Sequence, residues 1–146
     1  MNLFGVMDVS GSALQAERLR AEVVASNMAN AETTRTPEGG PYRRQQVVFQ
    51  SAASDQGVFA NHLLSESNGD VGGVEVAAVV SDNTPGLRRY DPQHPDADKD
   101  GYVTYPDINP LTEMVDMMSA TRAYDLNSSA VQAAKGMIDT SLDILK

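Results

Sequence analysis

Apolar residues near the N-terminus recur at the alternating three- and four-residue spacing of a coiled-coil helix. This spacing predicts a long helix over about residues 2–31, and a second, adjacent apolar set widens its hydrophobic face. Pro37, Gly39 and Gly40 follow it and favour a turn over further helix. The repeating positions are Leu3, Met7, Leu14, Ala21, Val24, Met28 and Ala31, interrupted by polar Ser10 and Glu17.

The same spacing returns near the C-terminus. Asn109 is expected to cap a helix in which Pro110 takes the first position. Glu113 and Asp116 then fall near the positive end of the helix dipole. The apolar line comprises Met117, Tyr124, Val131, Ile138, Leu142 and Leu145, and several alanines lie alongside it. We therefore expect a second long helix that is apolar on more than one stripe.

The middle of the chain has a different pattern of short β-leaning runs, separated by Gly, Pro, Asn and Asp. These runs cover residues 43–50, 57–64, 73–80, 86–90 and 101–105. The sequence thus predicts an α+β fold whose two terminal helices pair as a coiled coil around a small β-rich middle. The predicted division is an N-terminal helix in 1–34, a β-rich region with loops in 35–107, and a C-terminal helix in 108–146.

This layout leaves a physical problem, because a helix pair within one chain buries only one stripe of each helix. The remaining apolar stripes would lie in water at a cost of about 25 cal/mol per Å². Small side chains let helices approach closely, and Met packs adaptably. We therefore expect copies of the chain or related subunits to cover these stripes. A compact bundle that buries its own stripes is the alternative.

Composition limits the partners. The formal net charge of −9 disfavours nucleic acid and anionic membrane surfaces, which both require clustered Lys and Arg. The absence of Cys excludes disulfides, thiol nucleophiles and Cys-ligated zinc. No run approaches the ~20 apolar residues of a membrane span. Charged Asp8, Glu17 and Arg18 break up the N-terminal region, so we expect neither membrane insertion nor a cleaved signal peptide.

Residues 95–107, PDADKDGYVTYPD, resemble a calcium-binding EF-hand loop. Its ligand positions hold Asp96, Asp98 and Asp100, its turn position Gly101, and its last position Asp107 in place of the usual Glu. Pro92 and Pro95 disfavour the helix that should precede such a loop. We interpret the segment as a polar turn leading into a strand. A small calcium-binding module over 96–107 is the alternative function.

No arrangement typical of an active site is present. His62 and His94 are the only histidines, and neither belongs to an H-E-x-x-H, G-x-S-x-G or phosphate-loop pattern. We therefore expect a protein that is not an enzyme and that needs no cofactor. A hydrolase assembled from distant Ser, His and Asp residues is the alternative.

Two pairs of basic residues stand out in this acidic chain. They are Arg43 with Arg44, and Arg88 with Arg89. Each pair is expected either to meet local carboxylates or to contact acidic surfaces of neighbouring subunits.

Three stretches resemble bacterial flagellar basal-body rod proteins. Residues 25–49, ASNMANAETTRTPEGGPYRRQQVVF, contain the S-N-x-A-N-x-x-T turn that follows the first helix of flagellar axial proteins. Residues 90–109, YDPQHPDADKDGYVTYPDIN, are similar to the proximal-rod members of this family. Residues 113–127, EMVDMMSATRAYDLN, contain the R-A-Y-x-x-N core of the family's C-terminal helix motif. The resemblance covers nearly the whole chain in the expected order.

The resemblance implies a structural subunit of the proximal rod. In this family both terminal helices pair as a coiled coil and pack into the inner wall of a hollow helical tube, which transmits torque. Members are exported through the flagellar type III apparatus without signal cleavage, which implies a basal-body location within the periplasmic space. The implied partners are other proximal and distal rod proteins, copies of the chain itself, and the MS-ring or export-gate side of the basal body.

The family motifs supply candidate assembly contacts. Asn27 and Asn30 can hydrogen-bond backbone groups or fix helix register. Arg122 and Tyr124 can tie the two helices or adjacent subunits together through charge-assisted hydrogen bonds and packing. The resemblance favours these roles over ordinary helix surface or core. The full candidate set is Leu14, Asn27, Met28, Asn30, Arg122, Tyr124, Asn127, Val131, Ile138 and Leu142.

Overall fold

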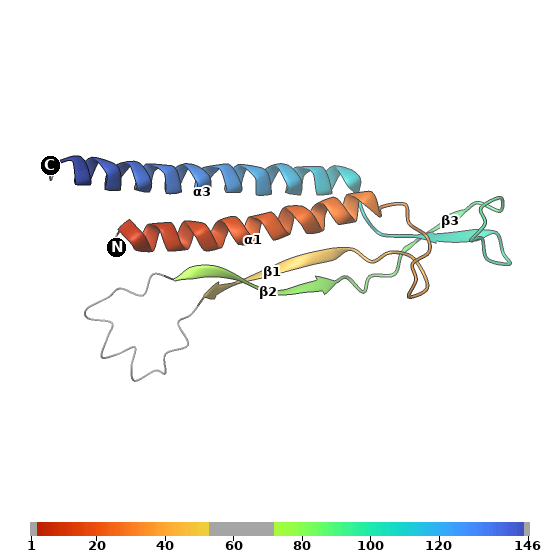
Figure 1. Cartoon of the computed structure of the whole chain (residues 1–146). Coiled ribbons are helices and arrows are strands. Elements are labelled where there is room, and N and C mark those ends of the chain that lie inside the picture. The colour runs from red at the N-terminus through yellow and green to blue at the C-terminus, as the bar shows by residue number, and fades with distance from the viewer. Residues whose placement is uncertain (1–2, 53–71, 145–146) are drawn as a thin grey trace, which may run out of the picture. The chain divides into compact units, whose positions relative to one another are not determined.

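The computed structural model describes residues 3–52 and 72–144, and within them two helices enclose a β-rich middle in sequence. The elements are α1 (Leu3–Ala29), β1 (Gln45–Ala52), β2 (Gly73–Ser81), β3 (Leu87–Tyr90), β4 (Tyr102–Tyr105) and α3 (Pro110–Ile144). Figure 1 traces this order from the N-terminal helix in red to the C-terminal helix in blue. The α+β class with N- and C-terminal helices is confirmed. The strand predicted over 57–64 lies outside the described residues.

The helix ends follow from local hydrogen bonding. Asn109 Oδ1 accepts the Leu111 N–H at 3.0 Å, which satisfies one of the unpaired donors in the first turn of α3. This confirms Asn109 as the cap and Pro110 as the first helical residue. At the end of α1, Asn30 Nδ2 donates to the Ser26 carbonyl at 2.9 Å, and its Oδ1 accepts the Thr33 hydroxyl. The chain therefore leaves α1 in a tight polar turn.

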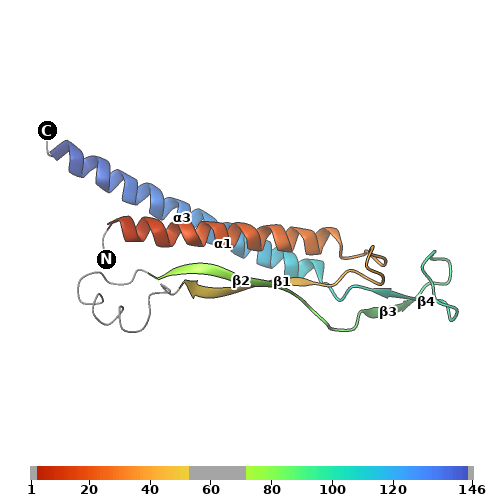
Figure 2. The same cartoon turned by 60° about the horizontal axis from the view of Figure 1, so that its bottom comes forward.

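The strands form two separate two-stranded sheets, β1 with β2 and β3 with β4. β3 and β4 are antiparallel, with Leu87 opposite Tyr105 and Tyr90 opposite Tyr102 (Figure 2). Their connecting loop closes through an Asp91 N–H bond to the Gly101 carbonyl at 3.0 Å. Gly101 has a φ of 78°, and a Cβ there would lie 2.9 Å from the Tyr90 ring. Glycine is required at this turn for both reasons.

The chain packs as two compact units, and each unit combines parts of both helices with part of the middle. Unit 1 draws on the described residues of Met1–Arg18, Phe49–Ala77 and Thr121–Lys146, and unit 2 on Leu19–Val48 and Ala78–Ala120. The cores are built from small side chains, in keeping with the 5% aromatic content. Their buried residues include Ser10, Ala16 and Ala134 in unit 1, and Val23, Val24, Asn27, Val103, Ile108, Glu113 and Ala120 in unit 2.

In unit 1, Ser12 joins the start of β2 to α1. Its hydroxyl donates to the Val9 carbonyl at 2.8 Å and accepts the Val74 N–H at 3.0 Å. A Cβ at Gly73 would lie 2.7 Å from the Ser12 Oγ, so β2 approaches α1 this closely only because residue 73 is glycine. Neither α1 nor α3, over the residues described, has a stretch apolar enough to cross a membrane.

Candidate assembly surfaces

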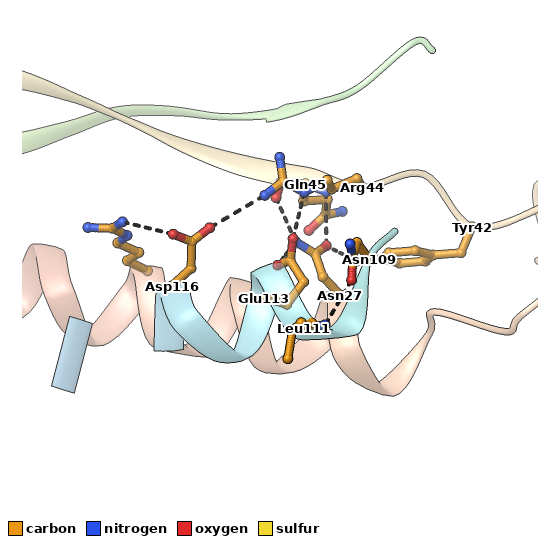
Figure 3. Close-up of polar contacts among 9 residues, drawn as sticks. Asn27, Tyr42, Arg44, Gln45, Asn109, Leu111, Glu113 and Asp116 are labelled. Carbon is orange, nitrogen blue, oxygen red and sulfur yellow. Dashed lines mark hydrogen bonds and ion pairs between the residues drawn. The ribbon is translucent and has the colours of Figure 1, made fainter. Parts of the chain in front are cut away.

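The most buried polar side chains of unit 2 meet in one network, drawn in Figure 3. Glu113, from the first turns of α3, is only 1% exposed. Its carboxylate accepts a hydrogen bond from Arg44 Nε at 2.6 Å and another from Asn27 Nδ2 at 3.1 Å. A buried carboxylate is costly unless a cation and hydrogen-bond donors compensate it. Both are present here, so Glu113 links α3 to α1 and to the residue that precedes β1.

Asn27 is the centre of this network. Its Nδ2 donates to the Gln45 carbonyl at 2.8 Å as well as to Glu113. Its Oδ1 accepts the Gln45 N–H at 2.9 Å and the Tyr42 hydroxyl at 3.2 Å. Two donors and two acceptor lone pairs are the full capacity of an amide side chain. The prediction that Asn27 bonds backbone groups is confirmed, and α1 and β1 are held in one register by these bonds.

Asp116, one helical turn beyond Glu113, extends the network. Its carboxylate lies 3.5 Å from Arg44 Nη2 and 3.6 Å from Arg20 Nη2. Arg44 therefore pairs with two carboxylates of α3, while Arg43 donates to the Asn83 side chain at 2.7 Å. Of the two alternatives for this basic pair, Arg44 satisfies the first, a pairing with local carboxylates.

The opposite side of the same helical turns is apolar and exposed. Four large side chains lie there at helical spacing: Leu111, Met114, Val115 and Met118. Leu111 is 70% exposed and Met118 52%. The start of α3 thus places its carboxylates toward the interior of unit 2 and its apolar side chains in solvent. This is the reverse of the pattern expected for a surface helix of an isolated globular protein.

Residues 95–107 begin in the loop between β3 and β4 and run through β4, so the element before them is a strand and not a helix. The carboxylate of Asp96 accepts the Thr34 hydroxyl at 2.8 Å and lies 3.6 Å from Arg35. Asp96 therefore holds the turn after α1 against the hairpin loop. Within 3–52 and 72–144, no three His, Cys, Asp or Glu side chains are placed to hold a metal ion. The interpretation as a polar turn leading into a strand is confirmed, and the calcium alternative gains no support.

Unit 2 contains a cleft of about 400 Å³, the kind of feature in which a catalytic site could lie. It is lined by backbone-rich turns and by Arg43, Asp82 and Asp107. Thr84 donates both its N–H and its hydroxyl to Asp82, and these bonds lower the pKa of the Asp82 carboxyl. His94 does not line this cleft; its ring packs edge-on against Tyr105 instead. The lowered pKa of Asp82 makes its carboxylate a weak base for the Thr84 hydroxyl. His62 lies outside the described residues.

Comparison with known proteins identifies the family. The model described as "Flagella basal body rod protein" matches residues 7–35, and "Flagellar basal body rod FlgEFG protein C-terminal" matches residues 99–144. The flagellar basal-body rod protein FlgC of Borreliella burgdorferi is 43% identical over 100% of this chain and 99% of its own length. The FlgC proteins of Bacillus subtilis and Salmonella typhimurium are 42% and 39% identical, and each alignment covers at least 98% of both chains.

The chain belongs to the FlgC family of flagellar basal-body rod proteins. It is therefore a structural rod subunit of the flagellar basal body, which assembles with other rod components. The polar network joins the two family-matched regions, because Asn27 lies in the first and Glu113 in the second.

The structure distributes the ten candidate assembly residues over both units. Of these ten, Asn27 is the one that belongs to the described network. In unit 2, Met28 and Asn30 are half-buried beside the end of α1. In unit 1, Leu14, Asn127, Val131 and Ile138 are half-buried, whereas Arg122, Tyr124 and Leu142 are exposed. Asn127 donates to the Ala123 carbonyl of its own helix at 2.9 Å.

Sequence reasoning missed Arg44, Glu113 and Tyr42 as members of one site. The signal that could have found Glu113 is a seven-residue spacing. Glu113, Ala120 and Ala134 are buried, and Asn127 at the intervening position is half-buried. This line of small and polar residues, and not the line of large apolar residues, marks the sheltered side of α3.

Proposed function

We propose that this rod subunit belongs to the proximal rod and assembles into a hollow helical drive shaft that transmits torque. The observation that carries the proposal is the reversed start of α3, with Glu113 buried and Leu111 and Met118 in solvent. Apolar area in water is unfavourable by about 25 cal/mol per Å². Exposed apolar patches on soluble chains mark contact surfaces. A neighbouring subunit covers this side of α3 in the rod.

The two terminal helices are proposed to pair as a coiled coil and to form the inner wall of the tube. The heptad spacing of α1 and the seven-residue spacing of the sheltered positions of α3, Glu113, Ala120 and Ala134, support this pairing. Residues 1–34 and 108–146 supply the wall, and residues 35–107 the β-rich outer part. The ten candidate residues contribute in two ways: the half-buried ones set the distance between helices, and exposed Arg122, Tyr124 and Leu142 contact neighbours.

The proposed neighbours are other proximal and distal rod proteins, copies of the chain, and the MS-ring or export-gate side of the basal body. The family membership supports rod neighbours in general. The subunit lies within the periplasmic space and is exported without a cleaved signal peptide, as the resemblance implies. Its role is structural and not catalytic.

The experiment introduces a charge on the far part of α3. Leu142 is 56% exposed, so Leu142→Asp leaves the lone subunit folded but places a carboxylate on a covered surface. We expect loss of rod assembly and of swimming, with an unchanged circular dichroism spectrum of the purified chain. Val131→Asp tests the half-buried part of the same helix and is expected to act in the same direction.

The matched control is Gln132→Asp, which adds the same charge at an exposed polar position of the same helix. It is expected to swim normally. Normal swimming of cells that carry Leu142→Asp as their only copy would contradict the proposed covering of this part of α3.

A further inference from the structure

In the β3–β4 hairpin of unit 2, basic residues lie on a strand and acidic residues lie in the connecting loop. Arg88 and Arg89 lie on β3, and Asp98 and Asp100 lie in the loop that connects it to β4 (Figure 2). All four side chains are exposed. We call Arg88, Tyr90 and Tyr102, which share one face of the hairpin, the cationic stem, and Asp98 with Asp100 the acidic tip. Arg89 is paired with Val103 and lies on the other face.

The stem is organised by aromatic contacts. The Arg88 guanidinium carbon lies 4.9 Å from the centre of the Tyr102 ring. The Tyr102 ring meets the Tyr90 ring edge to face at 5.3 Å. Stacking on an aromatic ring holds a guanidinium in place and leaves its N–H donors available. Tyr90 is nevertheless 64% exposed, so this ordered patch of two tyrosines and an arginine faces solvent.

The charges of the hairpin are uncompensated within the described residues. Neither Arg88 nor Arg89 forms an ion pair there, whereas Arg35 and Arg44 pair with Asp96 and Glu113. At the tip, the Asp98 carboxylate accepts the backbone N–H of Lys99, and no cation of 3–52 or 72–144 pairs with Asp100. The chain has a net charge of −9, yet neither basic residue of β3 forms an ion pair with an acidic group of 3–52 or 72–144.

We propose that the cationic stem of one copy binds the acidic tip of the next copy in the rod. The inference rests on the proposed function, because it requires copies of the chain to be neighbours. Arg pairs with carboxylates through two parallel N–H donors, and Tyr and Arg dominate binding energy at protein interfaces. Edge protection alone explains charges on a strand but not exposed tyrosines beside them.

The second copy is chosen because both complementary patches belong to this one hairpin. Two different patches of the same chain make a head-to-tail contact, which repeats from copy to copy. Such a contact generates rings or helices, and this is the geometry that a rod needs.

The test uses the natural absence of Cys from the chain. Arg88→Cys and Asp100→Cys are combined in one variant, which replaces the native chain in flagellated cells. We expect mild oxidation of isolated basal bodies to produce a ladder of covalent multiples of 15.6 kDa. The matched control combines Asp100→Cys with Arg43→Cys, because Arg43 is equally exposed but bonded to Asn83 within its own subunit. The control is expected to give monomers.

The outcomes separate this inference from the proposed function. Swimming cells whose basal bodies contain the variant, but give no ladder, would leave the structural role intact and overturn the stem–tip contact. A covalent product with a protein of different mass would overturn it too, since the stem then faces another subunit.

A charge exchange covers the case in which the Cys variant does not assemble. Arg88→Asp is expected to lower the swimming fraction at least about tenfold, and so is Asp98→Arg with Asp100→Arg. The three changes together are expected to restore swimming. Circular dichroism checks that each variant is folded. If the stem variant and the tip variant are both folded and defective in swimming, and the combined variant does not swim either, the contact would be overturned.

Discussion

An ordinary surface helix is apolar on its inner side and polar on its outer side. In the first turns of α3 the arrangement is reversed. The inner side carries Glu113 and Asp116, both engaged with Arg44. The outer side carries exposed apolar residues, among them Val115 and Met118. The inner side has its partners within one chain, whereas the outer side is exposed in the single chain and is proposed to be covered by a neighbour. Under this proposal, one helix separates the interactions that fold the subunit from those that assemble it.

The inner side of α3 makes directional polar contacts, and the outer side offers non-directional apolar ones. Hydrogen bonds and ion pairs are directional, so the inner network permits one register between α1, β1 and α3. Buried polar groups are retained in some helix pairs for this kind of specificity, at a cost in stability. Apolar contacts are not directional, and Met is especially adaptable. The outer side can therefore pack against subunits that are related but not identical, as the components of a rod are.

The largest effect is expected from charges on the outer side. Val115→Asp combined with Met118→Asp should abolish rod assembly and swimming. The free energy of unfolding of the purified chain should change by less than about 0.5 kcal/mol, because both side chains are already exposed. Motility in soft agar and urea denaturation measure the two quantities separately.

Thr112→Asp with Ser119→Asp is the control, since both residues are exposed polar positions on the same turns. These cells are expected to swim. If the apolar pair instead lowered the stability of the isolated chain by several kcal/mol, the outer side would be part of the subunit's own core and the comparison would fail.

A smaller effect, on folding, is expected from the inner side. Glu113→Ala removes the buried carboxylate and leaves the Arg44 guanidinium and the Asn27 amide without their acceptor. Breaking a buried ion pair from one side costs about 3 kcal/mol. Urea denaturation should show this loss for Glu113→Ala, and a near-neutral result for the exposed Glu38→Ala. A loss below 0.5 kcal/mol at Glu113, on the order of an exposed substitution, would show that the network does not hold unit 2.

Much of the fold could be predicted because local chemistry determines it. Asn109 and Pro110 indicate the start of α3, and Pro37 with the following glycines indicates that α1 ends before them. Short β-leaning runs separated by Gly, Pro, Asn and Asp predicted the four strands that the structure describes. The division into two compact units could not be read from the sequence. Each unit joins segments that are distant along the chain, and periodicity carries no information about such pairings.

The site was only partly predictable for a related reason. Asn27 stood out because it belongs to the S-N-x-A-N-x-x-T motif that resembles flagellar axial proteins. Its partner Glu113 looked like an ordinary acid near a helix start, and that role requires no burial. The heptad line of large apolar residues predicts a sheltered side of α3 at the wrong positions. In fact small residues such as Ala120 and Ala134 mark it, because close packing of elements demands small side chains there.

The smallest effect on stability and swimming is expected at the cap of α3, which holds the first turn of the helix and so positions both of its sides. Asn109→Ala removes the acceptor of the Leu111 N–H and should cost about 1 kcal/mol of unfolding free energy, as measured in urea. Asn109→Asp keeps an acceptor at the cap and adds a charge favoured by the helix dipole, so it should retain full stability. A frayed first turn displaces Glu113 and Leu111 together. We therefore expect a modest loss of stability and of swimming in Asn109→Ala, and recovery of both in Asn109→Asp. Stability could instead fall while swimming stays normal. In that case the cap would position the inner side of α3 only, and the outer apolar surface would begin beyond the first turn.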